Sequence, residues 1–156
     1  MNEHEALYNQ ADEDRAAGND ERAFATFSML AEAGHADAML QLALMYSTGS
    51  GIRFDMATAI EWERRAAEAG SKIALLNLGI SYRHIGEIVL ARETFEKAAA
   101  LGDDEACLEL AKLFSVSTRE TDTVLRYLRR VIASDGVTEA SQEDAEYLLR
   151  VVSGGL

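Results

Sequence analysis

The chain has 156 residues, enough for one domain whose apolar core needs neither a metal nor a disulfide. It contains no proline and is rich in alanine. Helices are therefore favoured over sheets, because alanine costs least in a helix and proline costs most. The formal net charge of −12 disfavours nucleic acid and anionic lipid as partners and favours cationic ones.

Turn residues divide the chain into nine predicted helices, arranged as four pairs and one final helix. The ranges that we expect are 2–17 with 20–33, 36–48 with 55–69, 71–85 with 87–101, 103–116 with 120–134, and 138–152. Ser71 and Asp103 stand where N-caps belong, and Ser117 with Glu120 has the spacing of a capping box. These features predict an all-α fold.

An internal repeat relates the four pairs. Residues that coincide at offsets of 32 or 36 are Leu42, Leu78 and Leu110 in the first helices, Ala23, Ala59 and Ala91 in the second helices, and Gly34, Gly70 and Gly102 at the exits. Small residues let two antiparallel helices approach closely. We therefore expect one repeat domain over 1–152, with repeats at about 4–35, 36–71, 72–103 and 104–136, a cap at 138–152 and a frayed tail at 153–156.

The last predicted helix is amphipathic and is expected to cap the stack. Its apolar residues are expected to cover the fourth pair; they are Tyr147, Leu148, Val151 and Val152. Its charged residues are expected to face water; they are Glu143, Asp144 and Arg150.

Residues 36–71 carry a spaced series of small, aromatic and turn residues. The series is Ala38, Leu42, Tyr46, Gly49, Gly51, Asp55, Ala59, Trp62, Ala66, Ala67 and Gly70. In these residues the chain resembles the Sel1-like repeat (SLR), a relative of the tetratricopeptide repeat. The third pair resembles the tetratricopeptide repeat itself, through Leu78, Gly79, Tyr82, Ala91, Phe95 and Ala98. The resemblance implies a right-handed α-α superhelical solenoid of four antiparallel helix pairs plus a C-terminal capping helix.

That family implies a concave groove, lined by the first helix of each pair, that binds a protein or a peptide without catalysis. The partner-binding residues expected from the register are Glu5, Tyr8, Asp12, Asp37, Leu40, Leu44, Leu76, Ile80, Arg83, His84, Glu105 and Lys112. The same register places Ile73 and Leu108 in the strip. An apolar centre with a charged rim is a common construction of protein interfaces. Binding by the convex face, through exposed residues of the second helices, stays open as an alternative.

Candidate chemical sites have simpler structural interpretations. Cys107 shares a helix position with buried apolar residues, so we expect an inert thiol. The histidines His4, His35 and His84 lack metal-ligand spacing. Residues 49–51 lack the rest of a phosphate-binding loop, and Trp62 is expected to pack between helices. We therefore expect no metal, no cofactor and no enzymatic activity.

The function that we expect is that of a non-enzymatic module that binds a protein partner. A narrower hypothesis is an immunity-type inhibitor that neutralises a basic toxin or nuclease, because the negative charge would accelerate that encounter. The alternative is an adaptor or regulatory scaffold that binds peptides in a bacterial signalling or envelope pathway. A single cysteine, and an opening MNEHEALYNQADED without a charged-then-apolar leader, predict a cytoplasmic protein. Partner identity and oligomeric state stay open.

Overall fold

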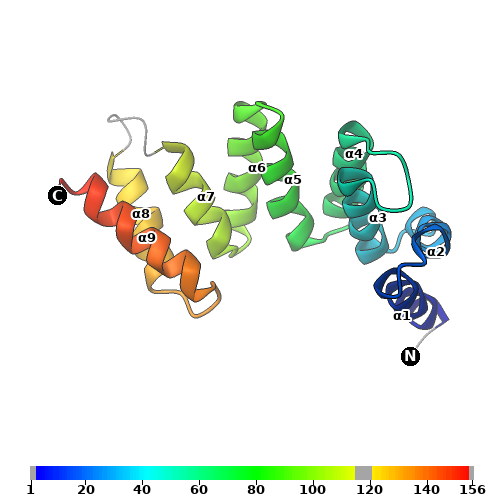
Figure 1. Cartoon of the computed structure of the whole chain (residues 1–156). Coiled ribbons are helices and arrows are strands. Elements are labelled where there is room, and N and C mark those ends of the chain that lie inside the picture. Colours follow the sequence, from blue (N-terminus) through cyan, green and yellow to red (C-terminus); the bar gives the residue numbers. More distant parts are fainter. Residues whose placement is uncertain (1–2, 115–120, 155–156) are drawn as a thin grey trace. The chain divides into compact units, whose positions relative to one another are not determined.

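The computed structural model describes residues 3–114 and 121–154. Within these residues the chain forms nine α-helices and no strand (Figure 1), which confirms the predicted all-α class and the predicted order of helices. The helices are α1 Glu3–Ala16, α2 Asp20–Glu32, α3 Ala36–Thr48, α4 Met56–Glu68, α5 Lys72–His84, α6 Ile88–Ala100, α7 Asp104–Phe114, α8 Thr121–Ile132 and α9 Glu139–Val152. The predicted capping box at Ser117 and Glu120 and the last two residues of the predicted tail lie outside the described residues.

The chain divides into two compact units, Met1–Leu78 (unit 1) and Gly79–Leu156 (unit 2). The boundary falls inside α5, so each unit contains part of that helix. The single domain expected over residues 1–152 stays a prediction.

Unit 1 is built from antiparallel helices that pack in sequence: α1 on α2, α2 on α3 and α3 on α4. Its core contains large apolar side chains with little or no exposure, among them Phe27, Leu30, Leu42 and Met45. Alanines of the repeat lie between them and are fully buried; they include Ala11, Ala23, Ala38 and Ala59. The expected role of the small residues, close approach of paired helices, is confirmed in this unit.

Unit 2 repeats this arrangement, with α6 on α7, α7 on α8 and α8 on α9. Phe95, Leu110 and Leu128 form its core and have no exposed surface. Gly79 lies against the ring of Phe95, where an added Cβ would come within 2.5 Å of a ring carbon. A glycine at this position therefore lets the two helices approach more closely than an alanine would.

Polar side chains begin several helices. The Ser71 hydroxyl accepts a hydrogen bond from the Ala74 N–H at 3.3 Å, and the Asp103 carboxylate accepts one from the Ala106 N–H at 3.1 Å, which confirms both predicted N-caps. Three further caps were not expected from the sequence: His35, Asp55 of α4 and Thr138 of α9. His35 begins α3, where its Nδ1 accepts from the Ala38 N–H at 3.3 Å.

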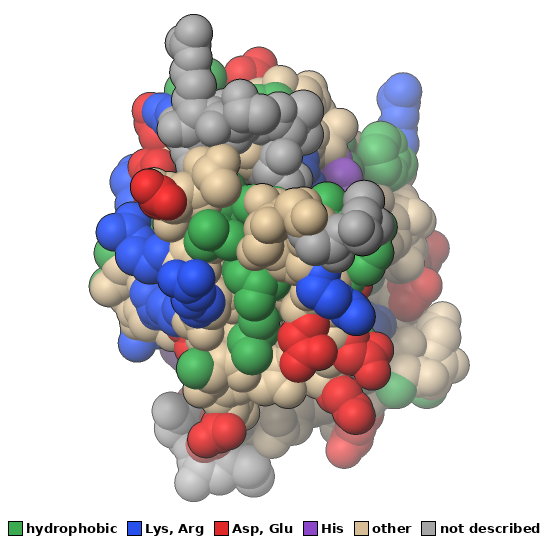
Figure 2. All heavy atoms as spheres, turned by 90° about the vertical axis from the view of Figure 1, so that its left-hand side faces the viewer, with side chains coloured by type: hydrophobic (Ala, Val, Ile, Leu, Met, Phe, Trp, Pro, Cys, Tyr) green, Lys and Arg blue, Asp and Glu red, His purple; other side chains and the backbone are tan. Residues whose placement is uncertain are grey.

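The final helix α9 packs on the stack through only part of the predicted face, which includes Leu148 and Val152. The buried residue at its centre is Ala145, which lies in line with half-buried Ser141, Leu148 and Val152. Tyr147 is 60% exposed and Val151 is 39% exposed, so their predicted covering role is wrong. The smallest side chain lies where α9 comes closest to its neighbours, which turns the larger Tyr147 outward. Figure 2 looks onto this end of unit 2 and shows a strip of hydrophobic side chains there.

Candidate protein-binding surfaces

The first helices of unit 1 present exposed aliphatic and acidic side chains. On α3 the outer positions are Asp37, Leu40 and Leu44, spaced as neighbours on one helical face. Asp37 is exposed, Leu40 is half-buried and Leu44 is 45% exposed. On the first part of α5, Ile73 is 64% exposed, the most among the large apolar side chains described. We use the name first-helix surface for six residues of the first helices α1, α3 and α5, of which Glu5 is exposed and Leu76 half-buried; they are Glu5, Asp37, Leu40, Leu44, Ile73 and Leu76.

Tyr8 lies at the junction of α1 and α3 rather than on an open surface. Its ring stacks on the His35 ring at 5.2 Å between centroids and lies 5.6 Å from the Phe27 ring. Its hydroxyl accepts a hydrogen bond from Gln41 Nε2 at 3.2 Å. These contacts give Tyr8 a structural role in joining two first helices. Asp12, the neighbouring predicted residue, pairs with Arg15 at 3.0 Å.

The connection between α3 and α4 presents an aromatic residue that the sequence reasoning missed. Phe54 is 57% exposed and borders a hollow of about 560 Å³, which is lined by Tyr46, Ile52, Arg53, Phe54, Asp55 and Met56. Gly51, at a φ of 71°, rests against Asp20, where an added Cβ would lie 2.5 Å from the Asp20 Cβ. The position of Phe54 in the sequence could have indicated that its side chain is exposed. A large apolar residue between a glycine turn and an N-cap has no helix face on which to be buried.

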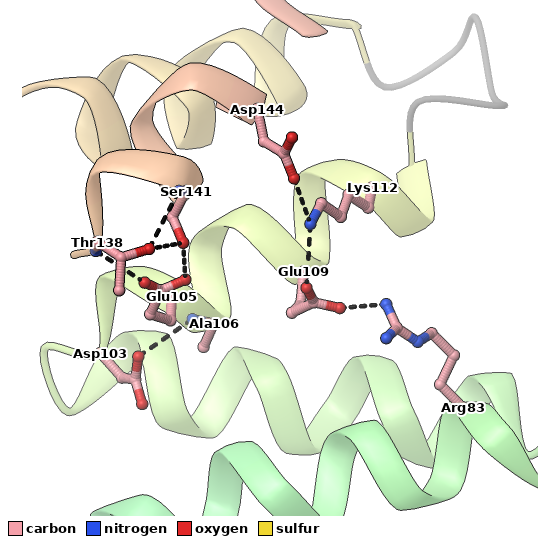
Figure 3. A network of polar contacts seen from close by, with 9 residues as sticks. All are labelled: Arg83, Asp103, Glu105, Ala106, Glu109, Lys112, Thr138, Ser141 and Asp144. Atoms are coloured by element: carbon pink, nitrogen blue, oxygen red, sulfur yellow. Dashed lines mark hydrogen bonds and ion pairs between the residues drawn. The ribbon is translucent and has the colours of Figure 1, made fainter. Parts of the chain in front are cut away.

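In unit 2 the predicted Arg83 and Lys112 belong to an internal ionic network (Figure 3). Both pair with Glu109, Lys112 at 3.4 Å, and Lys112 also reaches Asp144 on α9 at 3.1 Å. The Glu109 side chain is only 14% exposed, so two cations neutralise a largely buried carboxylate. The network connects the end of α5, α7 and α9. The partner-binding role of Arg83 and Lys112 stays a prediction.

Glu105 joins α7 to the start of α9. Its carboxylate accepts hydrogen bonds from the Ser141 hydroxyl at 2.8 Å and from the Thr138 N–H at 3.2 Å (Figure 3). Leu108, one turn along α7, is 2% exposed, so its expected place in an open strip is wrong. The position is buried in unit 2, where α7 packs against α6, α8 and α9. Ile80 is half-buried and His84 is exposed, and their binding roles stay predictions.

The candidate chemical sites have structural roles in the described part of the chain. Cys107 has no exposed surface, and burial raises the pKa of its thiol to about 11, which makes a thiolate nucleophile rare at neutral pH. Trp62 is 9% exposed with the Arg65 guanidinium 4.0 Å above its ring, as expected of a packing residue. Residues 3–114 and 121–154 contain no cluster of three or more potential metal ligands.

None of the described helices is both long and apolar enough to cross a membrane.

Comparisons with known proteins identify the fold. No protein-family model and no curated protein matches the sequence. A Sel1 repeat protein from Oxalobacter formigenes superposes with a TM-score of 0.71 at 19% identity, over 98% of this chain and 74% of that one. The MamA protein gives 0.69 at 18% identity, over 99% of this chain and 85% of its own. The SLR-fold antigen c5321 of uropathogenic Escherichia coli gives 0.54 at 20% identity, over 86% of this chain and 41% of that one. The chain therefore has the helical-repeat fold of the SLR and tetratricopeptide type, as the resemblance predicted.

Proposed function

We propose that this SLR-type helical-repeat protein is a non-enzymatic binding module that holds a cationic protein partner on the first-helix surface of unit 1. One observation supports this most directly: Leu44 and Ile73 expose 45% and 64% of their surface on first helices. Unit 1 contains thirteen Asp and Glu against six Lys and Arg, a net charge of −7. An apolar contact within an acidic unit suits a partner whose surface is apolar and basic.

The two kinds of side chain have different roles in this proposal. Apolar surface removed from water contributes roughly 25 cal/mol per Å² of buried area, so Leu44 and Ile73 supply affinity. Leu40 and Leu76 are half-buried and complete the proposed apolar centre. Exposed carboxylates such as Glu5 and Asp37 raise the association rate by attracting positive charge over long distances.

The biological role that we propose is an immunity-type inhibitor of a basic toxin or nuclease. Proteins that act on nucleic acids present positive surfaces, because they must bind phosphates. A chain of net charge −12 competes for such a surface and covers it without needing chemistry of its own.

The binding surface is tested by a double variant, Leu44→Asp with Ile73→Asp. Its matched control is Ala25→Asp with Met29→Asp, which adds the same charge at exposed positions of α2, a second helix. Wild type, variant and control are immobilised and used to capture protein from a lysate of the source cell. The proposal requires one partner that wild type and control retain and that the Leu44/Ile73 variant loses. Equal capture by all three would show that the surface is wrong.

The inhibitor role is tested on the partner so identified. We expect its enzymatic or toxic activity to disappear on binding, and its association rate to fall steeply when added salt shortens the screening length, which is about 10 Å at 0.1 M. Tight binding that leaves the activity intact would instead favour the adaptor alternative. An association rate independent of salt would contradict charge steering.

A further inference from the structure

The end of unit 2 formed by α8 and α9 separates positive from negative charge. Helix α8 contains one aspartate and three arginines, a net charge of +2, and α9 contains four acidic residues and one arginine, a net charge of −3. In the described residues no ion pair joins these two helices. Arg130 pairs instead with Asp104 at 2.6 Å, and Asp144 pairs with Lys112. Both partners belong to α7.

Two arginines on α8 therefore keep their charge available to another molecule. Arg126 and Arg129 are exposed, and neither forms an ion pair with any described carboxylate. On α9, Glu143 and Glu146 are exposed in the same way.

An apolar strip accompanies these charges. Tyr147 and Val151 lie one turn apart on α9 and are 60% and 39% exposed. Both helices also contain half-buried aliphatic side chains; they are Leu125, Ile132, Leu148, Leu149 and Val152. Figure 2 shows a hydrophobic strip with mostly Lys and Arg side chains on one side, and on the other side mostly Asp and Glu side chains with basic ones among them. This order of basic, apolar and acidic surface is the observation on which the inference depends.

We propose that a second copy of this chain covers the α8–α9 end and forms a two-fold symmetric dimer. A two-fold axis along the apolar strip turns each copy so that its basic edge faces the acidic edge of the other. The favourable contact is formed twice, once on each side of the axis, as a self-complementary interface requires. The two apolar strips meet between the charged edges, which matches the apolar centre and charged rim of stable interfaces. The dimer is independent of the binding surface proposed for unit 1.

The first test measures self-association directly. Sedimentation equilibrium of the full chain is expected to give a monomer–dimer equilibrium. The variant Tyr147→Glu with Val151→Glu should raise the dimer dissociation constant about tenfold or more, because it places charge in the centre of the interface. The control Met29→Glu, an equally exposed apolar residue in unit 1, should leave the constant unchanged. A wild-type chain that stays monomeric at all accessible concentrations would overturn the proposal.

The second test uses the symmetry. One variant reverses the basic edge (Arg126→Glu with Arg129→Glu) and the other reverses the acidic edge (Glu143→Arg with Glu146→Arg). Each variant alone should be monomeric, because like charges then face each other twice. An equimolar mixture should form the heterodimer, in which both contacts are attractive again.

Other outcomes of the second test contradict the proposal in distinct ways. Variants that remain dimeric alone would place the interface elsewhere. Folded variants, checked by circular dichroism, that stay monomeric when mixed would exclude the two-fold pairing of edges. Open-ended chains of the wild type would indicate a head-to-tail contact instead.

Discussion

Replacing Gly79 by alanine tests the close packing that organises unit 2. Gly79 lies on α5 against the Phe95 ring of α6, and an added Cβ would lie 2.5, 2.6 and 3.0 Å from Cε1, Cδ1 and Cζ of that ring. Favourable contacts between carbon atoms have separations of about 3.5–4.0 Å. Phe95 has no exposed surface, so its ring cannot move aside into solvent.

Two opposing terms determine the expected effect of Gly79→Ala. Alanine is better than glycine in a helix by about 1 kcal/mol, which favours the variant. Overpacking of a dense core costs about 1–3 kcal/mol, and three contacts about 1 Å too short put this site near the upper end. We expect a net loss of about 1–2 kcal/mol in the free energy of unfolding. At this chain length, that corresponds to a fall in Tm of about 2–4 °C per kcal/mol.

Urea denaturation followed by circular dichroism measures this loss. Phe95→Leu serves as the partner variant because it removes Cε1 and Cζ, two of the three contacting atoms. The double variant Gly79→Ala with Phe95→Leu should cost less than the sum of the single variants, since the alanine then has room. If Gly79→Ala stabilises the protein, or if the two costs simply add, then the ring contact does not control this position.

Three further predictions concern polar and titratable side chains. Hydrogen bonds from Thr58 lower the pKa of Asp55, the N-cap of α4. The Asp55 carboxylate therefore stabilises the fold above its unfolded pKa, and this stabilisation disappears as the pH falls through its folded pKa. Asp55→Ala should lower the urea midpoint at pH 7, and the variant should match wild type in strong acid. Glu109→Gln should lower the free energy of unfolding by about 1 kcal/mol in low salt, because two cations lose their shared carboxylate. The loss should be smaller in high salt, which melting curves over a series of salt concentrations would measure. Cys107, with its pKa raised to about 11, should react with iodoacetamide at pH 8 only when urea unfolds the protein; rapid labelling of the native chain, followed by mass spectrometry, would contradict its burial.

The repeat pattern was sufficient to predict the helices because the pattern and the helices both depend on which residues lie close together in the sequence. Ala23 and Ala59 recur at equivalent positions and are fully buried in equivalent packing sites, and Gly79 lies where a small residue was expected. Ser71 and Asp103 act as N-caps because a short polar side chain before a helix has few other uses.

The surfaces were harder to predict because the exposure of a residue depends on neighbours that periodicity does not identify. Leu108 occupies a first-helix position equivalent to that of Leu40, yet only Leu108 is fully covered. On α9 both Ala145 and Tyr147 belong to apolar stripes, and the sequence does not tell which stripe packs inward. The pairs Arg83–Glu109 and Lys112–Asp144 depend on contacts between helices that are far apart in the chain, whereas Lys112–Glu109 lies within α7.

The connection between α3 and α4 contains residues that the fold constrains and, between them, residues that are exposed. Gly51 cannot gain a side chain without displacing Asp20, and Asp55 holds the start of α4, so both ends of the segment are constrained. Arg53 and Phe54 between them are exposed. Evolution or a protein engineer can therefore exchange these two side chains to alter molecular recognition while the scaffold beneath remains as it is.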